Sequence, residues 1–114
     1  MSTTDQNHTA RIRALNDQFR VHGEGRGSIA LTSGIQALGE LSVIKILIAV
    51  RDFEAFDADN DPWNEHDFGA LDVEGQRVFF KIDYYDRSIT TGSPDPADPE
   101  VTHRALTIML ADEY

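Results

Sequence analysis

The first clear pattern in the chain is a helical one. Apolar side chains recur every three or four residues from about Thr9 onward, while charged side chains fall on the other side of the helical wheel. The apolar positions are Ile12, Leu15 and Phe19. This spacing predicts an amphipathic helix that ends near Gly23 and covers a sheet with its apolar face. We expect the polar residues 1–8 to form a flexible N-terminus.

Residues 43–53 form the most apolar stretch of the chain. Two short elements are predicted before it, a strand over residues 28–32 and a helical turn over residues 35–38. The β-branched residues of the apolar stretch also suit a strand. However, the side chains that tolerate water recur in it at helical spacing: Lys45, Ala49 and Asp52. We therefore expect a helix, capped by Ser42 and more deeply buried than any other helix of the fold.

The strongest strand signal surrounds Glu74-Gly75. Glycine readily takes a positive φ, so this dipeptide suits the two-residue turn of a β-hairpin. Counting outward from the turn predicts three cross-strand pairs: Asp72 with Arg77, Phe68 with Lys81, and His66 with Asp83. The same register gathers one apolar face: Leu71, Val73, Val78, Phe80, Ile82 and Tyr84. A slip of one residue would mix polar and apolar residues on both faces, so this register is the self-consistent one.

A proline-rich loop separates the hairpin from the last predicted element. Asp98, Pro99 and Glu100 supply a cap, a first-turn proline and a first-turn acid, which together predict the start of a helix. The inward face of this helix would hold Val101, Ala105 and Ile108. The whole order predicts a small single α+β domain over residues 9–114. Its helices pack on one face of a mainly antiparallel sheet with a central β-hairpin.

Charge is unevenly distributed along the chain. The net charge is −10; residues 52–114 hold sixteen acidic and four basic residues, a net of −12, against +2 for residues 1–51. Such a surface repels nucleic acid and anionic membranes, so we expect neither to bind directly and expect a basic protein partner. The chain has no cysteine, no signal-peptide pattern and no apolar run of the roughly 20 residues that cross a bilayer. These features predict a cytoplasmic protein and leave its oligomeric state open.

Four strings of the sequence are familiar in combination. They are NDPWNEHDFG (residues 60–69), FFKIDYYD (79–86), GSPDPADP (92–99) and LTIMLADEY (106–114). Together they resemble a bacterial family known as domain of unknown function 3768, which occurs in plasmid-bearing proteobacteria. The resemblance extends over nearly the whole chain from the first helix onward. It implies a small protein encoded on a plasmid or chromosomal island. The family carries no established activity, so no catalytic residues can be transferred from it.

The acidic loop before the hairpin has some features of a cation site. Asp57, Asp59 and Asp61 have the spacing of the first ligands of a calcium-binding EF-hand loop. Pro62 and Phe68 stand where that loop needs glycine and glutamate, which excludes an EF-hand. A looser oxygen site for a divalent cation stays open. The alternative is a solvated loop in which the aspartates make local turn bonds.

His66 is the second candidate for chemistry. It precedes Asp67 and lies opposite Asp83 in the predicted register, and these three residues form a candidate metal site. A histidine–carboxylate pair serves as a general base, as a metal site or as a structural hydrogen bond. One hypothesis is therefore a cation-binding or metal-assisted hydrolase domain. Its residues would be Asp59, Asp61, Glu65, His66, Asp67 and Asp83.

The leading hypothesis is a non-enzymatic interaction module that presents an acidic surface to a basic protein. The expected binding surface consists of Asp57, Asp59, Asp61, Trp63, Glu65, Asp67, Asp83, Tyr85, Asp86 and Arg87, with Asp95 nearby. A sharper form of this hypothesis is a DNA mimic, whose carboxylates stand in for phosphates on a nucleic-acid-binding protein. A third hypothesis is a structural subunit whose acidity serves solubility only.

Overall fold

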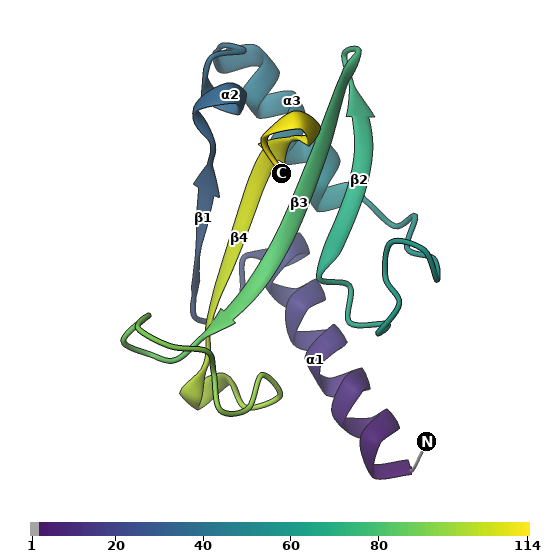
Figure 1. Cartoon of the computed structure of the whole chain (residues 1–114), viewed down its shortest axis with the longest axis vertical. Coiled ribbons are helices and arrows are strands. Elements are labelled where there is room, and N and C mark those ends of the chain that lie inside the picture. Colours follow the sequence, from purple (N-terminus) through teal and green to yellow (C-terminus); the bar gives the residue numbers. More distant parts are fainter. Residues whose placement is uncertain (1–2) are drawn as a thin grey trace.

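The computed structural model describes residues 3–114 of the chain (Figure 1). The helices are α1 (Thr3–His22), α2 (Ser33–Gln36) and α3 (Glu40–Asp52), with short 3₁₀ turns η1 (Pro99–Val101) and η2 (Ala111–Glu113). The strands are β1 (Gly27–Leu31), β2 (Phe68–Val73), β3 (Gln76–Tyr85) and β4 (His103–Leu110). The flexible segment expected at residues 1–8 falls partly outside the described residues, and from Thr3 onward the chain is helical.

The four strands form one mixed sheet in the order β1-β4-β3-β2. β1 runs parallel to β4, whereas β4, β3 and β2 pair antiparallel. Helices α1 and α3 lie on the same face of this sheet (Figure 1). This arrangement confirms the predicted α+β fold with a β2–β3 hairpin. Within residues 3–114, no helix combines the length and apolar character that crossing a membrane requires.

The core fills the space between the helices and the sheet. Its buried side chains are Phe19, Ile35, Ile46, Val50, Phe53, Val78, Phe80, Ile82, Leu106 and Ile108. Alternation along β3 and β4 sends every second side chain toward the helices, which is the period expected of a half-covered sheet. The other face of the sheet, which we call the open face, carries neither α1 nor α3, and Tyr114 packs on it against Phe68 and Phe79.

The hairpin forms as predicted. Glu74 and Gly75 take positive φ values of 51° and 80°, which are typical of the two-residue turn that matches strand twist. The ladder pairs Asp72 with Arg77 and Phe68 with Lys81, which confirms the predicted register. It begins at Phe68, so His66 lies outside it.

The predicted C-terminal helix is wrong, because the segment is strand β4. Asp98 does cap a turn through its side chain, which accepts from the backbone nitrogen of Glu100 at 2.9 Å, but the turn is only the three residues of η1. Beyond it, alternate side chains point into the core: Arg104, Leu106 and Ile108. Apolar side chains therefore recur in this segment with the period of two that is typical of a strand. The segment pairs with β3 on one side and with β1 on the other.

The helix predicted over residues 43–53 is confirmed as α3, but two details are wrong. It begins at Glu40 after Gly39, whose φ is 96°, and its start has no side-chain cap, so Ser42 does not serve as one. Nor is α3 deeply buried, since only Ile46 and Val50 of it are. Four of its apolar side chains are exposed: Leu41 (76%), Ile44 (51%), Leu47 (36%) and Ile48 (45%).

Candidate functional site

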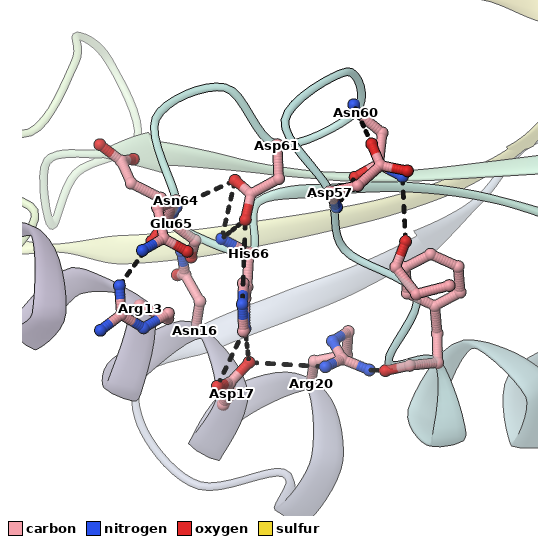
Figure 2. A network of polar contacts seen from close by, with 12 residues as sticks. Arg13, Asn16, Asp17, Arg20, Asp57, Asn60, Asp61, Asn64, Glu65 and His66 are labelled. Carbon is pink, nitrogen blue, oxygen red and sulfur yellow. Dashed lines mark hydrogen bonds and ion pairs between the residues drawn. The ribbon is translucent and has the colours of Figure 1, made fainter.

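The loop over residues 53–67 connects α3 to β2 and is shaped by its own aspartates (Figure 2). Asp57 accepts hydrogen bonds from the backbone nitrogens of Asp59 and Asn60 at 2.9 and 3.0 Å. The buried Asp61 accepts from the backbone nitrogens of Glu65 and His66 at 3.0 and 3.2 Å. These two carboxylates therefore make the local turn bonds that the alternative interpretation of the loop expected.

His66 turns inward, toward α1. Its φ is +58°, which takes it out of the extended path of β2, and its Nδ1 donates to Asp17 at 2.9 Å. Its Nε2 lies 3.8 Å from Asp61, and its ring stacks on Phe56 at a centroid distance of 3.9 Å. The expected partner Asp83 instead forms an ion pair with Lys81 at 2.9 Å. The structure thus replaces the predicted His66–Asp83 pair by His66–Asp17.

Arg20 ties α1 to the end of α3. Its Nη1 donates to the carbonyl oxygens of Val50, Arg51 and Phe53 at 2.8 to 3.0 Å, where the helix leaves carbonyls without partners. Burial lowers the pKa of Arg20, and the neighbouring Asp17, 3.5 Å from Nη2, opposes that change. A guanidinium at this end also complements the helix dipole.

Asn16 is fully buried and joins α1 to both the loop and the sheet. Its Nδ2 donates to the carbonyl of Glu65 and to the Tyr84 hydroxyl at 2.9 and 2.8 Å, and its Oδ1 accepts from Nε of Arg104 at 2.7 Å. The Tyr84 hydroxyl donates to the Glu65 carboxylate at 2.8 Å, and burial raises the pKa of Tyr84. These groups satisfy one another, as buried polar groups must.

A cleft of about 600 Å³ opens between α1 and the end of α3. Asp17, Arg20, Phe56 and His66 line it, and the described residues around it include no serine, threonine or lysine. The side chains of Arg20 and His66 bind backbone carbonyls and Asp17, which joins α1 to α3 and to the loop. We therefore interpret this cluster as a structural one.

A second hollow, of about 370 Å³, lies on the open face of the sheet. Lys81 and Asp83 reach it because they alternate with the core residues Phe80 and Ile82 along β3. Its lining is rich in acids and aromatic rings: Asp59, Asn60, Pro62, Trp63, Asp67, Phe68, Lys81, Ile82, Asp83 and Tyr114. Trp63 and Tyr114 are 72% and 75% exposed. We call this feature the acidic hollow.

The acidic hollow has an excess of negative charge. Lys81 is the one base in its lining, and it is already paired with Asp83. Burial, together with the nearby Glu65, raises the pKa of Asp67 from 3.8 to about 6. A carboxylate with a raised pKa holds its negative charge at a cost, so a cation placed beside it would be stabilising.

The predicted binding surface is divided by the structure. Four of its residues line the acidic hollow: Asp59, Trp63, Asp67 and Asp83. Tyr85 ends β3, and the exposed Arg87 follows in the next loop. Asp86 organises that loop by accepting from Thr90 and Thr91, which lowers its pKa. Asp95 accepts from His8 at 2.8 Å.

The three residues of the predicted metal site line two different hollows. His66 lines the cleft beside α1, whereas Asp67 and Asp83 line the acidic hollow. Among the described residues, no group of three or more His, Asp or Glu side chains is placed to hold a metal ion.

Sequence reasoning missed the residues of α1 that reach the loop. Asn16 and Arg20 are four apart and adjoin Phe19 on the wheel, so both lie on the buried face of the helix. Polar residues on a buried helical face need hydrogen-bond partners. Their place beside Phe19 on the helical wheel is therefore the signal by which the sequence could have identified Asn16 and Arg20.

One comparison with known proteins gives a match. The model of a family described as "Protein of unknown function (DUF3768)" matches residues 31–113. Helix α1 precedes the matched residues, so Asn16, Asp17 and Arg20 lie outside them. Neither the curated proteins nor the solved structures give a match to the chain.

Proposed function

The chain belongs to the DUF3768 family of proteins of unknown function, and we propose that it is a non-enzymatic module that binds a basic protein. The contact point is the acidic hollow, which receives a lysine or arginine side chain of the partner. The observation that carries this proposal is the meeting of three carboxylates and two exposed aromatic rings around one hollow: Asp59, Asp67, Asp83, Trp63 and Tyr114.

The chemistry of the hollow suits a basic side chain. Carboxylates bind an ammonium or guanidinium group by charge-assisted hydrogen bonds. The rings of Trp63 and Tyr114 offer faces for cation–π contact with the same group and apolar area for its aliphatic stem. The net charge of −12 over residues 52–114 adds a longer-range attraction that speeds encounter with a basic partner.

A bound divalent cation is the weaker alternative. A metal ion needs several oxygen ligands within a fixed distance, whereas a guanidinium spreads its five donors over a wider area. The described residues hold no converging ligand group of that kind. The metal-assisted hydrolase hypothesis needs the same kind of ligand group, so the geometry around His66 and the acidic hollow gives it no support.

The proposal can be tested with a probe that does not require the natural partner. A lysine- and arginine-rich peptide of about ten residues would be titrated into the protein while Trp63, the single tryptophan, reports binding by its fluorescence. We expect Asp59→Asn with Asp83→Asn to weaken binding about tenfold and to reduce its salt dependence. Glu24→Gln with Glu100→Gln removes the same charge from exposed sites elsewhere and serves as the matched control.

Equal weakening by both double variants would contradict the proposal, since net charge alone would then explain binding. An unchanged Trp63 signal on peptide binding would contradict it as well.

The DNA-mimic form of the proposal needs a separate experiment. The tagged chain would be exposed to a lysate of its own host at low salt, and retained proteins would be eluted with duplex DNA. A mimic retains a nucleic-acid-binding protein that duplex DNA displaces and that the hollow variant, but not the control variant, fails to retain. Retention that resists both DNA and salt would exclude mimicry.

A further inference from the structure

The outward face of α3 is apolar although nothing in the described chain covers it. Its sequence has the pattern of a helix buried on nearly all sides, yet Leu41, Ile44, Leu47 and Ile48 are exposed. A helix with apolar residues all round is normally enclosed by protein. A contiguous exposed apolar patch of this kind is typical of an interface.

The exposed residues form a stripe with charges at its two ends. Leu41, Ile44 and Ile48 are three and four residues apart, so they lie in one line along the helix. Glu40 stands at the start of the stripe and Arg51 at its end. The charged residues of α3 sum to zero: Glu40, Lys45, Arg51 and Asp52.

We infer that α3 is the contact through which two copies of this chain associate, with the two helices packed antiparallel about a two-fold axis. Such packing, centred between positions 45 and 46, brings Ile44 of each copy against Leu47 and Ile48 of the other. It also places Glu40 of one copy level with Arg51 of the other, and the two-fold axis repeats this pair. The contact is therefore complementary to itself in shape and in charge.

The charge distribution explains why the occupant is a second copy. The chain carries −10 in total, so most faces of two copies repel each other, whereas the charged side chains of α3 itself sum to zero. The acidic hollow lies on the open face of the sheet, opposite the helices, so a dimer through α3 leaves both hollows free for a basic partner.

The Glu40–Arg51 pair can form only between copies. The two residues are eleven positions apart, which is about 16 Å along a helix, too far for a contact within one chain. Arg51 uses Nε to reach its neighbour Asp52, and its other nitrogens remain available to a second copy.

Sedimentation equilibrium over a range of concentrations tests the contact. We expect a monomer–dimer equilibrium for the unchanged chain. Ile44→Ser with Ile48→Ser should raise the dissociation constant of the dimer at least about tenfold. Both side chains are exposed, so the variant keeps its fold, which circular dichroism would verify. A chain that stays monomeric throughout, whether or not vesicles or other proteins bind the α3 face, overturns the inference.

A charge exchange tests the antiparallel geometry. Glu40→Arg alone and Arg51→Glu alone should each weaken the dimer, while the two together restore it by recreating the pair in reverse. Glu100→Arg makes the same charge change on an exposed residue outside α3 and should leave the dimer intact. Failure of the double variant to recover dimerisation overturns the antiparallel arrangement.

Discussion

One guanidinium, that of Arg20, accounts for much of the contact between α1 and the end of α3. Its Nη1 donates to three carbonyl oxygens, and its Cζ lies over the rings of Phe56 and Phe80, 5.2 and 5.5 Å from their centroids. A lysine has no planar fork with which to do the same. Nε of Arg20 is buried and has no hydrogen-bond partner among residues 3–114, which is a cost that the other contacts of the side chain offset.

Replacing Arg20 by methionine should lower the free energy of unfolding by about 3 kcal/mol. The change keeps the aliphatic length but removes the donor of the Arg51 and Phe53 carbonyls and the shorter of the two bonds to the Val50 carbonyl. Urea unfolding followed by circular dichroism would measure it. Arg87→Met, at an exposed loop residue, is the control and should alter stability by less than about 0.5 kcal/mol. A similar small effect at Arg20 would refute its structural role.

Asp67 makes the stability of the chain depend on pH in an unusual direction. Its pKa in the folded chain, about 6, is higher than the ordinary value of 3.8, so the folded state binds this proton more tightly. The contribution of Asp67 to stability therefore falls as pH rises from about 4 to about 6. Ionised Asp67 is destabilising at neutral pH.

Asp67→Asn should therefore raise the free energy of unfolding at pH 7.5 by about 1 to 2 kcal/mol, after allowance for partial contact with solvent. The gain should vanish as the pH is lowered through about 6 toward about 4, where the aspartate is itself protonated. Urea titrations at both ends of this range would measure the difference. Asp112→Asn, at an exposed residue, should show no such pH-dependent gain.

At the scale of the elements, the β2–β3 hairpin is the part that the sequence specifies most locally. Gly75 takes its positive φ without steric cost, but Glu74 takes one as well, at 51°, where a residue with a Cβ is strained. Asparagine tolerates this conformation better than glutamate. The turn is thus not optimal at its first position.

Glu74→Asn should raise the free energy of unfolding by about 0.5 to 1 kcal/mol, because Asn-Gly is the preferred sequence of this turn. The variant also loses the exposed ion pair of Glu74 with Lys45, whose atoms are 3.4 Å apart. Glu74→Ala loses the same pair without the gain in turn preference, so it separates the two effects. Thermal unfolding of both variants would show whether asparagine stabilises beyond alanine, and no difference would contradict the argument.

How far the sequence predicted the fold depends on how local each signal is. The hairpin register follows from Glu74-Gly75 and from alternation on either side, and it was predicted correctly. The segment after Asp98 has the sequence of a helix start. However, pairing with β3 and β1, which are distant in the sequence, makes it a strand. The partners of His66 were beyond reach for the same reason, since Asp17 is 49 residues away.

The exposure of α3 could not be predicted from its pattern either. A helix with apolar residues on nearly every side gives no indication of which side the rest of one chain will cover. The acidic hollow was half predictable, because Asp59, Trp63 and Asp67 share one loop, whereas Tyr114 arrives from the other end of the sequence.

At the scale of the whole molecule, the excess of acid sets how the fold responds to salt. Residues 52–114 carry −12 and include many exposed carboxylates, which repel one another at low ionic strength. Raising the salt concentration from about 10 to about 150 mM shortens the screening distance from about 30 to about 8 Å. The repulsion that opposes folding is thereby reduced.

We expect the unfolding temperature to rise by a few degrees over this range of sodium chloride. Differential scanning calorimetry would measure it. The Asp59→Asn with Asp83→Asn variant carries less charge and should gain less. A fall in unfolding temperature would mean that ion pairs such as Lys81–Asp83 contribute more to stability than repulsion removes.

The order β1-β4-β3-β2 places the last strand of the chain in the interior of the sheet. Gly27 of β1 pairs with Arg104 of β4, so β1 has no neighbouring strand in this sheet until β4 has been synthesised. During synthesis, the backbone groups of β1 and of one edge of β3 therefore stay unpaired until β4 is available. A message that stops shortly before β4 would therefore yield a chain with two open edges and no complete core, a natural substrate for aggregation or proteolysis. Translation of β4 is thus a condition for completing the sheet.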